Sequence, residues 1–178
     1  MKKVLFVVLT FIFVLVSLAG AQPLKVGDSA SDFKLKDAKG KEFTLSASEF
    51  AGRVLLIMYV DPDEKDLNVH VEDALLKERD AGNLSTTAYR SFGVTNLKDT
   101  NKPNFLIRQI IKSKQEKTGA IILLDYDHSL LNLWGLKRDS SDVILLDKNR
   151  ICQFIHRGKM SPDDVTKVIE LIKEYQAK

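Results

Sequence analysis

The chain has 178 residues, of which 44% are hydrophobic and 29% are charged, with a formal net charge of +3 and one cysteine. This length suits one compact domain with its own core, and a single cysteine excludes a disulfide within the chain. Residues 1–21 contain two lysines and no acid, so the remainder has 25 basic and 24 acidic side chains. Such a near-neutral remainder argues against nucleic acid as a partner, because phosphate binding needs concentrated basic charge.

The first 21 residues have the pattern of a secretory signal peptide. Lys2 and Lys3 precede an apolar stretch over residues 4–18, and Ala19-Gly20-Ala21 has the small residues of a cleavage site. An uncleaved membrane anchor is the alternative, but the apolar stretch is short for a bilayer span of roughly 20 residues. We therefore expect cleavage after Ala21, export to the periplasm, no stable membrane anchor after cleavage, and one domain over residues 22–178.

The first half of that domain predicts a hairpin, a buried strand and a helix. Two alternating segments, 32–36 and 42–45, flank a polar turn and are typical of an N-terminal hairpin. Residues 54–60 are continuously apolar, which indicates a central strand buried on both faces. A helix is predicted from Pro62 to about Asp80, because an apolar stripe recurs at helical spacing and a glycine follows.

The second half alternates strands with helices, which predicts a mixed sheet covered by helices on both faces. The helix at 104–117 is expected to make its apolar contacts through Phe105, Ile107, Ile110 and Ile111. In the late hairpin, Cys152 is expected to share a face with Phe154. The predicted strands are 87–97, 120–124, 143–146 and 151–156, and the closing helix is 161–177.

Several motifs resemble the thioredoxin-like superfamily, specifically its peroxiredoxin and TlpA-like redoxins. Residues 26–33, VGDSASDF, are similar to the opening G-x-x-A-P-D-F motif, with Ser31 in place of proline. Residues 37–41, 52–57 and 143–151 follow the same pattern, so the resemblance covers nearly the whole domain. It implies a thioredoxin-like α/β fold, and it specifies fold more strongly than activity.

Two departures from the redoxins concern the chemistry. The resemblance places the redoxin cysteines near Asp63 to Leu67, where this chain has no thiol, and it places Ser141 where thioredoxins carry a cis-proline. A narrower resemblance, to the YtfJ family, accommodates both departures; it rests on Ser140-Ser141-x-Val143, residues 146–148, Arg150 and Ser161-Pro162. That family implies a secreted thioredoxin-like protein without C-x-x-C, and it supplies no catalytic residues to transfer.

The strand end at residues 61–66 has two interpretations. In the structural one, Asp61 is the N-cap, Pro62 the first helical residue and Glu64 the partner in a capping box, so carboxylates replace a thiolate. In the functional one, a polar cleft persists as a binding site. Its candidate residues are Asp61, Asp63, Asp66, Ser140 and Ser141.

We expect no metal and no cofactor. Asp61, Asp63 and Glu72 match positions 1, 3 and 12 of a calcium loop, but Lys65 and Asp66 break its pattern. The histidines lack the spacing of a metal motif, and His128, beside two aspartates, is best explained as part of a solvated loop.

The cysteine at position 152 leaves a redox alternative open. It lies in a strand-like stretch, where a free cysteine is usually a small buried hydrophobe. The leading hypothesis is therefore a non-catalytic periplasmic protein that binds an unknown protein partner or small ligand. The alternatives are an enzyme, either a single-cysteine redox protein that uses Cys152 or a catalyst acting from the Asp61–Asp66 cleft, and an assembly factor of the cell envelope.

Overall fold

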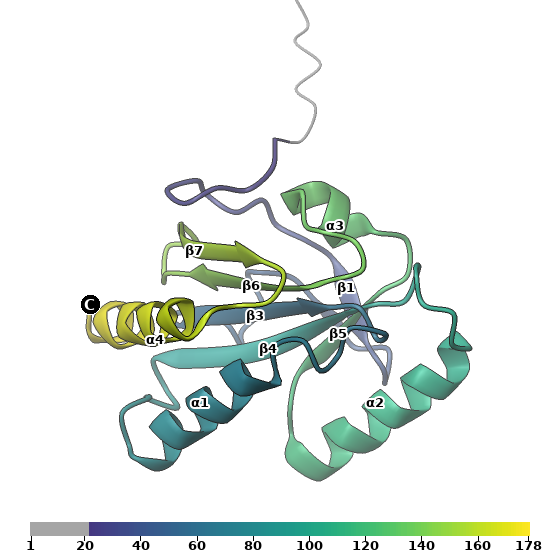
Figure 1. Cartoon of the computed structure of the whole chain (residues 1–178), viewed down its shortest axis with the longest axis horizontal. Helices are drawn as coiled ribbons and strands as arrows, with labels where there is room; N and C mark the ends of the chain where they lie inside the picture. The colour runs from purple at the N-terminus through teal and green to yellow at the C-terminus, as the bar shows by residue number, and fades with distance from the viewer. Residues whose placement is uncertain (1–21) are drawn as a thin grey trace, which may run out of the picture.

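A seven-stranded mixed sheet forms the centre of the molecule, as the computed structural model of residues 22–178 shows (Figure 1). The predicted signal peptide lies outside these described residues. The sheet order is β2-β1-β5-β4-β3-β6-β7; β3, β4 and β5 run parallel, and the other neighbours are antiparallel. The strands are β1 (Leu35–Asp37), β2 (Glu42–Phe43), β3 (Val54–Val60), β4 (Tyr89–Asn96), β5 (Ile122–Asp125), β6 (Ser141–Leu146) and β7 (Cys152–Arg157).

Helices cover both faces of this sheet, as predicted. The helices α1 (Val69–Asp80), α2 (Asn104–Thr118) and α4 (Pro162–Ala177) lie on one face, and α3 (Ser129–Trp134) lies on the other with the N-terminal segment (Figure 1). The continuous apolar run of β3 suits its central place in the sheet, because alternate residues are buried in the hydrophobic clusters on the two opposite faces. Leu55, Ile57 and Tyr59 pack on the α3 side, whereas Leu56 and Met58 pack beneath α1 and α4.

Helix α1 begins seven residues later than predicted. Residues 62–67 form turns, in which the Glu64 N–H donates to the Asp61 carbonyl and the Leu67 N–H donates to the Glu64 carbonyl. The helix starts only after Asn68, a buried residue whose amide donates to the carbonyls of Ser141 and Gly158 and accepts from the Met160 N–H. The predicted Asp61–Glu64 capping box is therefore wrong, because this long-range clamp sets where α1 can start.

Two predicted packing arrangements are also wrong. On α2, Ile107 and Ile111 are buried as expected, but Phe105 and Ile110 are each 68% exposed. On β7, Cys152 and Phe154 belong to cores on opposite faces of the sheet. A bulge causes the second difference: Leu145 pairs with Phe154 and Leu146 pairs with Cys152, which leaves an extra residue in β7 and reverses the alternation.

The N-terminal hairpin and the last helix agree with the sequence prediction. Strands β1 and β2 pair antiparallel, and the Asp37 carboxylate accepts from two N–H groups of their connecting turn. Helix α4 has a complete capping box between Ser161 and Asp164, with Pro162 in the first turn. Over residues 22–178, no helix has the length and apolar character needed to cross a bilayer.

Candidate functional site

Three neighbouring strands bring polar side chains to one edge of the sheet. Asp61 directly follows β3, Asn96 ends β4, and Ser140 directly precedes β6. Because β3 runs parallel to β4 and antiparallel to β6, the ends of β3 and β4 meet the start of β6, with Val60 paired to both Thr95 and Ser141. In an open α/β sheet, binding sites usually form at the carboxyl ends of the parallel strands, which is where these residues lie.

Asp61 is a buried carboxylate at the centre of this edge. It is only 2% exposed, and its Oδ1 accepts from the Asp63 N–H at 2.8 Å, while its Oδ2 lies 3.4 Å from the Asn96 amide nitrogen. Burial raises the pKa of Asp61 above its ordinary value, and the negative charges of Asp63, Asp139 and Asp99 raise it further against the opposing hydrogen bond. The folded chain therefore holds this carboxylate at an electrostatic cost.

Asp99 lies beside Asp61, but its surroundings stabilise the charged carboxylate instead of destabilising it. The Arg138 guanidinium pairs with its carboxylate, the Asn96 amide donates to it at 2.9 Å, and His128 Nε2 lies 2.7 Å from its Oδ2. The Arg138 hydrogen bond, assisted by those of Asn96 and His128, holds the pKa of Asp99 well below its usual range. Asp99 is therefore a fixed anion, and its His128 partner occupies a left-handed backbone conformation with φ 64°.

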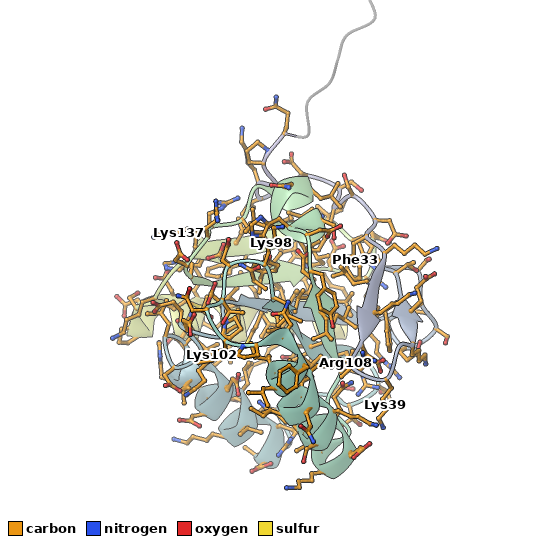
Figure 2. All side chains as sticks on the ribbon, turned by 90° about the vertical axis from the view of Figure 1, so that its right-hand side faces the viewer. Phe33, Lys39, Lys98, Lys102, Arg108 and Lys137 are labelled. Carbon is orange, nitrogen blue, oxygen red and sulfur yellow. The ribbon has the colours of Figure 1, made fainter. Side chains whose placement is uncertain are left out.

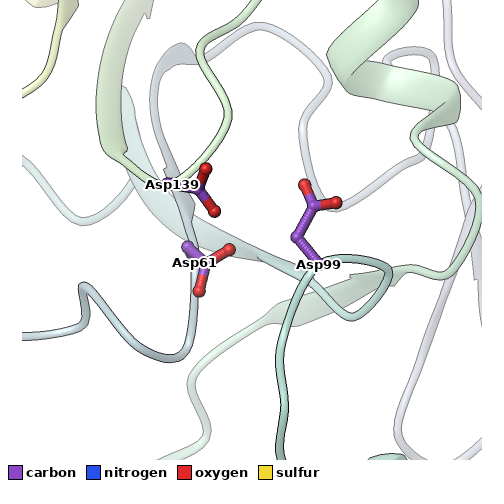
Figure 3. A group of neighbouring side chains, drawn as sticks. All are labelled: Asp61, Asp99 and Asp139. Atoms are coloured by element: carbon purple, nitrogen blue, oxygen red, sulfur yellow. The ribbon is translucent and has the colours of Figure 1, made fainter.

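A third carboxylate, Asp139, completes a compact acidic cluster. One carboxylate oxygen from each of Asp61, Asp99 and Asp139 lies within 4.8 Å of the others, and Figure 3 shows the three groups converging from separate loops. Asp139 is exposed, whereas Asp61 is buried, so the cluster opens outwards through Asp139. Oxygen atoms at this spacing can accept hydrogen bonds from a cationic group, or could ligate a hard cation.

The five candidate cleft residues occupy three different environments. Asp61, Ser140 and Ser141 are buried at the sheet edge, and the Ser140 hydroxyl donates to Asp142 at 2.9 Å. The side chain of Asp63 is 38% exposed and pairs with Lys102 in the loop before α2. That of Asp66 is 78% exposed and pairs with its neighbour Lys65, and Asp66 is not one of the clustered carboxylates.

The start of β6 is held rigidly by Asp142, which is fully buried. Its carboxylate accepts from the Lys137 N–H at 2.7 Å, from the Ser140 hydroxyl and from the Gly158 N–H at 3.0 Å. These bonds fix the backbone that carries Arg138, Asp139 and Ser140. Asp139 is thus carried by a loop that is tied to the start of β6.

The thiol of Cys152 is remote from this edge in the fold. Cys152 is 0% exposed in the core beneath α3, and its thiol donates to the Phe154 carbonyl at 3.4 Å. Burial raises the pKa of Cys152 to about 11, so the reactive thiolate is scarce at neutral pH. Both properties weigh against the single-cysteine redox alternative.

Two surface hollows lie away from the strand-end site. One, of about 380 Å³, is lined by Leu24, Ser31 and Trp134 among others, and the second, of about 300 Å³, lies between β1, the start of β4 and the end of α2. Neither includes a member of the acidic cluster or of the five candidates. The strand-end site is therefore separate from both hollows.

The chain belongs to the YtfJ_HI0045 family. The family model, described as a bacterial protein of unknown function, matches residues 23–175. A relative from Haemophilus influenzae, named only as an uncharacterized protein, is 27% identical over 130 residues, which are 71% of this chain and 68% of the relative. The family resemblance inferred from residues 140–150 and 161–162 is thereby confirmed.

Solved structures confirm the thioredoxin-like fold. The exposed lipoprotein thioredoxin Etrx1 from Streptococcus pneumoniae superposes with a TM-score of 0.59 at 17% identity, covering 79% of this chain and 99% of that one. A putative thiol:disulfide interchange protein DsbE from Chlorobium tepidum gives 0.59 at 18% identity, with 86% and 99% covered. A thiol peroxidase from Chromobacterium violaceum gives 0.58 at 14% identity, with 86% and 90% covered. At these identities the likeness establishes the fold alone.

Sequence reasoning missed several residues of this edge. The missed residues lie close to features that the sequence did indicate: Asp99 is two residues after the predicted strand 87–97, and Arg138 and Asp139 directly precede the candidate Ser140. A search of the residues around predicted strand ends could have found them. His128 was assigned to a solvated loop, but it is partly buried against Asp99, with its side chain 14% exposed. Asn96 ends a strand whose place in the middle of the sheet only the fold reveals.

Proposed function

We propose that this chain is an exported, periplasmic thioredoxin-fold protein that binds a protein partner or small ligand without thiol chemistry. The observation that carries the proposal is the acidic cluster of Asp61, Asp99 and Asp139, which stands at the strand ends where the redoxin resemblance places reactive cysteines. Disulfide exchange needs an accessible thiolate, and residues 61–67 hold none. The apolar stretch and small-residue site of residues 1–21 support the periplasmic location.

The electrostatics of the cluster favour a ligand that presents positive charge or several hydrogen-bond donors. Asp99 is already neutralised by Arg138, but the carboxylate of Asp139 has no hydrogen bond or ion pair within residues 22–178. The buried charge of Asp61 is costly in the free protein, and a cationic group bound at Asp139 would offset that cost. Strained or costly charges of this kind concentrate at functional sites.

A crosslinking comparison of variants tests this proposal. The protein with Asp61→Asn and Asp139→Asn keeps the shape of both side chains and removes two charges from the cluster. A matched control, Asp73→Asn with Glu170→Gln, removes two exposed charges from α1 and α4. We expect the wild-type and control proteins to capture the same partner protein from periplasmic extract by chemical crosslinking. The cluster variant should capture at least about tenfold less of that partner, a difference that corresponds to roughly 1.4 kcal/mol of binding free energy.

Folding must be matched before the captured amounts are compared. Circular dichroism and the midpoint of urea unfolding establish that each variant is folded at the temperature of the assay. Equal capture by the folded cluster variant and the wild-type protein would contradict the proposal and transfer attention to another surface.

A further inference from the structure

Helix α2 presents an apolar patch to solvent, made by Phe105, Leu106 and Ile110. These side chains are 68%, 44% and 68% exposed, although Ile107 and Ile111 of the same helix are buried against the sheet. Single exposed apolar residues are common, but here Leu106 and Ile110 lie one turn apart on the solvent-facing side of the helix, and Phe105 lies at the flank of that side. Large apolar side chains that stay exposed in the fold are candidates for contact with another surface.

The same helix concentrates basic charge. It has four basic side chains and one acidic side chain, whereas α1 and α4, on the same face of the sheet, each have two basic and four acidic ones. No basic residue of α2 forms an ion pair with another residue of the range 22–178. Viewed from the α2 side, the molecule shows Arg108 of this helix and, outside it, Lys39, Lys98, Lys137 and Lys102, of which Lys102 is paired with Asp63 (Figure 2).

The lysines of α2 extend the apolar patch along the helix. Lys112 is seven residues after Phe105, while Lys114 and Lys117 are four and seven residues after Ile110, so they lie on or beside the same exposed face. The solvent-facing side of α2 therefore has apolar side chains in its first half, and three lysines with one acidic residue, Glu116, in its second half. Its complement is a surface that is both apolar and negatively charged.

We propose that this face of α2 docks the protein reversibly onto an anionic phospholipid bilayer. Helices that lie in the membrane interface carry Phe and Leu together with Lys and Arg, and the solvent-facing side of α2 has both kinds of residue, although its main apolar face packs on the sheet. The alternative is an acidic protein partner, but lysine is depleted at protein interfaces. Neither surface hollow includes Phe105, Leu106 or Ile110, so the patch is separate from both.

Sedimentation with lipid vesicles tests the proposal on protein purified from the soluble fraction of cells. The probes are vesicles of phosphatidylcholine alone and of phosphatidylcholine with phosphatidylglycerol at about 3:1. We expect binding to the anionic vesicles, weakening with added salt, and little binding to neutral ones. Phe105→Ser with Ile110→Ser should reduce binding by about tenfold or more, and replacing lysines 112, 114 and 117 with Gln by about fivefold per lysine.

Matched controls separate the patch from general effects of surface change. Val69→Ser with Leu76→Ser removes two exposed apolar side chains, 40% and 45% exposed, from the net acidic helix α1. These controls should bind like the wild-type protein. Equal binding to neutral and anionic vesicles, or unchanged binding by the α2 variants, would overturn the proposal. Absence of binding to the anionic vesicles would also overturn it, and a protein captured by a crosslinker placed at position 105 would then assign the patch to a protein partner.

Discussion

Replacement of Asp125 by Ala is expected to lower the free energy of unfolding by about 3 kcal/mol, because several buried groups lose their shared partner. Asp125 ends β5 and is 0% exposed. Its carboxylate accepts from the Ser129 N–H at 2.8 Å, the Ser129 hydroxyl at 3.1 Å and the Leu130 N–H at 3.0 Å, at the start of α3. The Tyr59 hydroxyl donates to it at 3.1 Å from the central strand.

Urea unfolding followed by circular dichroism measures this loss. Asp127→Ala is the matched control, because Asp127 is exposed and contacts the same helix start through a single 3.2 Å bond from the Ser129 N–H. The control should lose no more than about 1 kcal/mol, as a weak capping residue does. A loss below about 1 kcal/mol for Asp125→Ala would show that Asp125 does not hold the strand to α3.

Replacement of Asp61 by Asn is expected to stabilise the protein at neutral pH. Burial and neighbouring carboxylates raise the pKa of Asp61 in the folded chain, so the folded state binds its proton more readily than the unfolded state. The wild-type free energy of unfolding therefore falls as the pH rises from the ordinary aspartate value through the raised folded value. Asn keeps the acceptor for the Asp63 N–H and carries no charge, so it avoids this loss.

The measurement is urea unfolding of both proteins between about pH 3 and pH 7. The advantage of Asn should be absent at the acid end, grow as the pH rises through that window, and stay constant above it. Asp66→Asn, a change at a side chain that is 78% exposed, should alter stability by no more than about 0.5 kcal/mol. A wild-type protein more stable than Asp61→Asn at pH 7 would show that the charge contributes to folding.

Local pattern was sufficient for most of the sheet. The run at 54–60 and the late hairpin were recognisable because buried strands are short, apolar and bounded by turns. The start of α1 could not be predicted in this way. Asn68 reaches Ser141, Gly158 and Met160, which are 73 to 92 residues away, and no local signal encodes such a clamp.

The candidate site was predictable only in part, for a related reason. Asp61 directly follows the predicted strand 54–60, and Ser140 lies three residues before the predicted strand 143–146, so the sequence indicated both. The partners Asp99 and Asp139 join the cluster through the order of strands, in which β4 lies beside β3 and β6 on its other side. The exposure of Phe105 and Ile110 on α2 was missed because helical periodicity alone did not show how wide its buried stripe is.

A redox assay of the purified protein tests the central claim most directly. Insulin-disulfide reduction and peroxide consumption are measured for the wild-type protein and for Cys152→Ser, together with labelling of the thiol by a water-soluble maleimide. Because the cysteine is buried and the pKa of its thiol is raised to about 11, we predict no turnover above buffer in either protein, and slow labelling until denaturant is added. Rapid native labelling, with turnover that disappears in Cys152→Ser, would contradict the account and establish a single-cysteine redox protein.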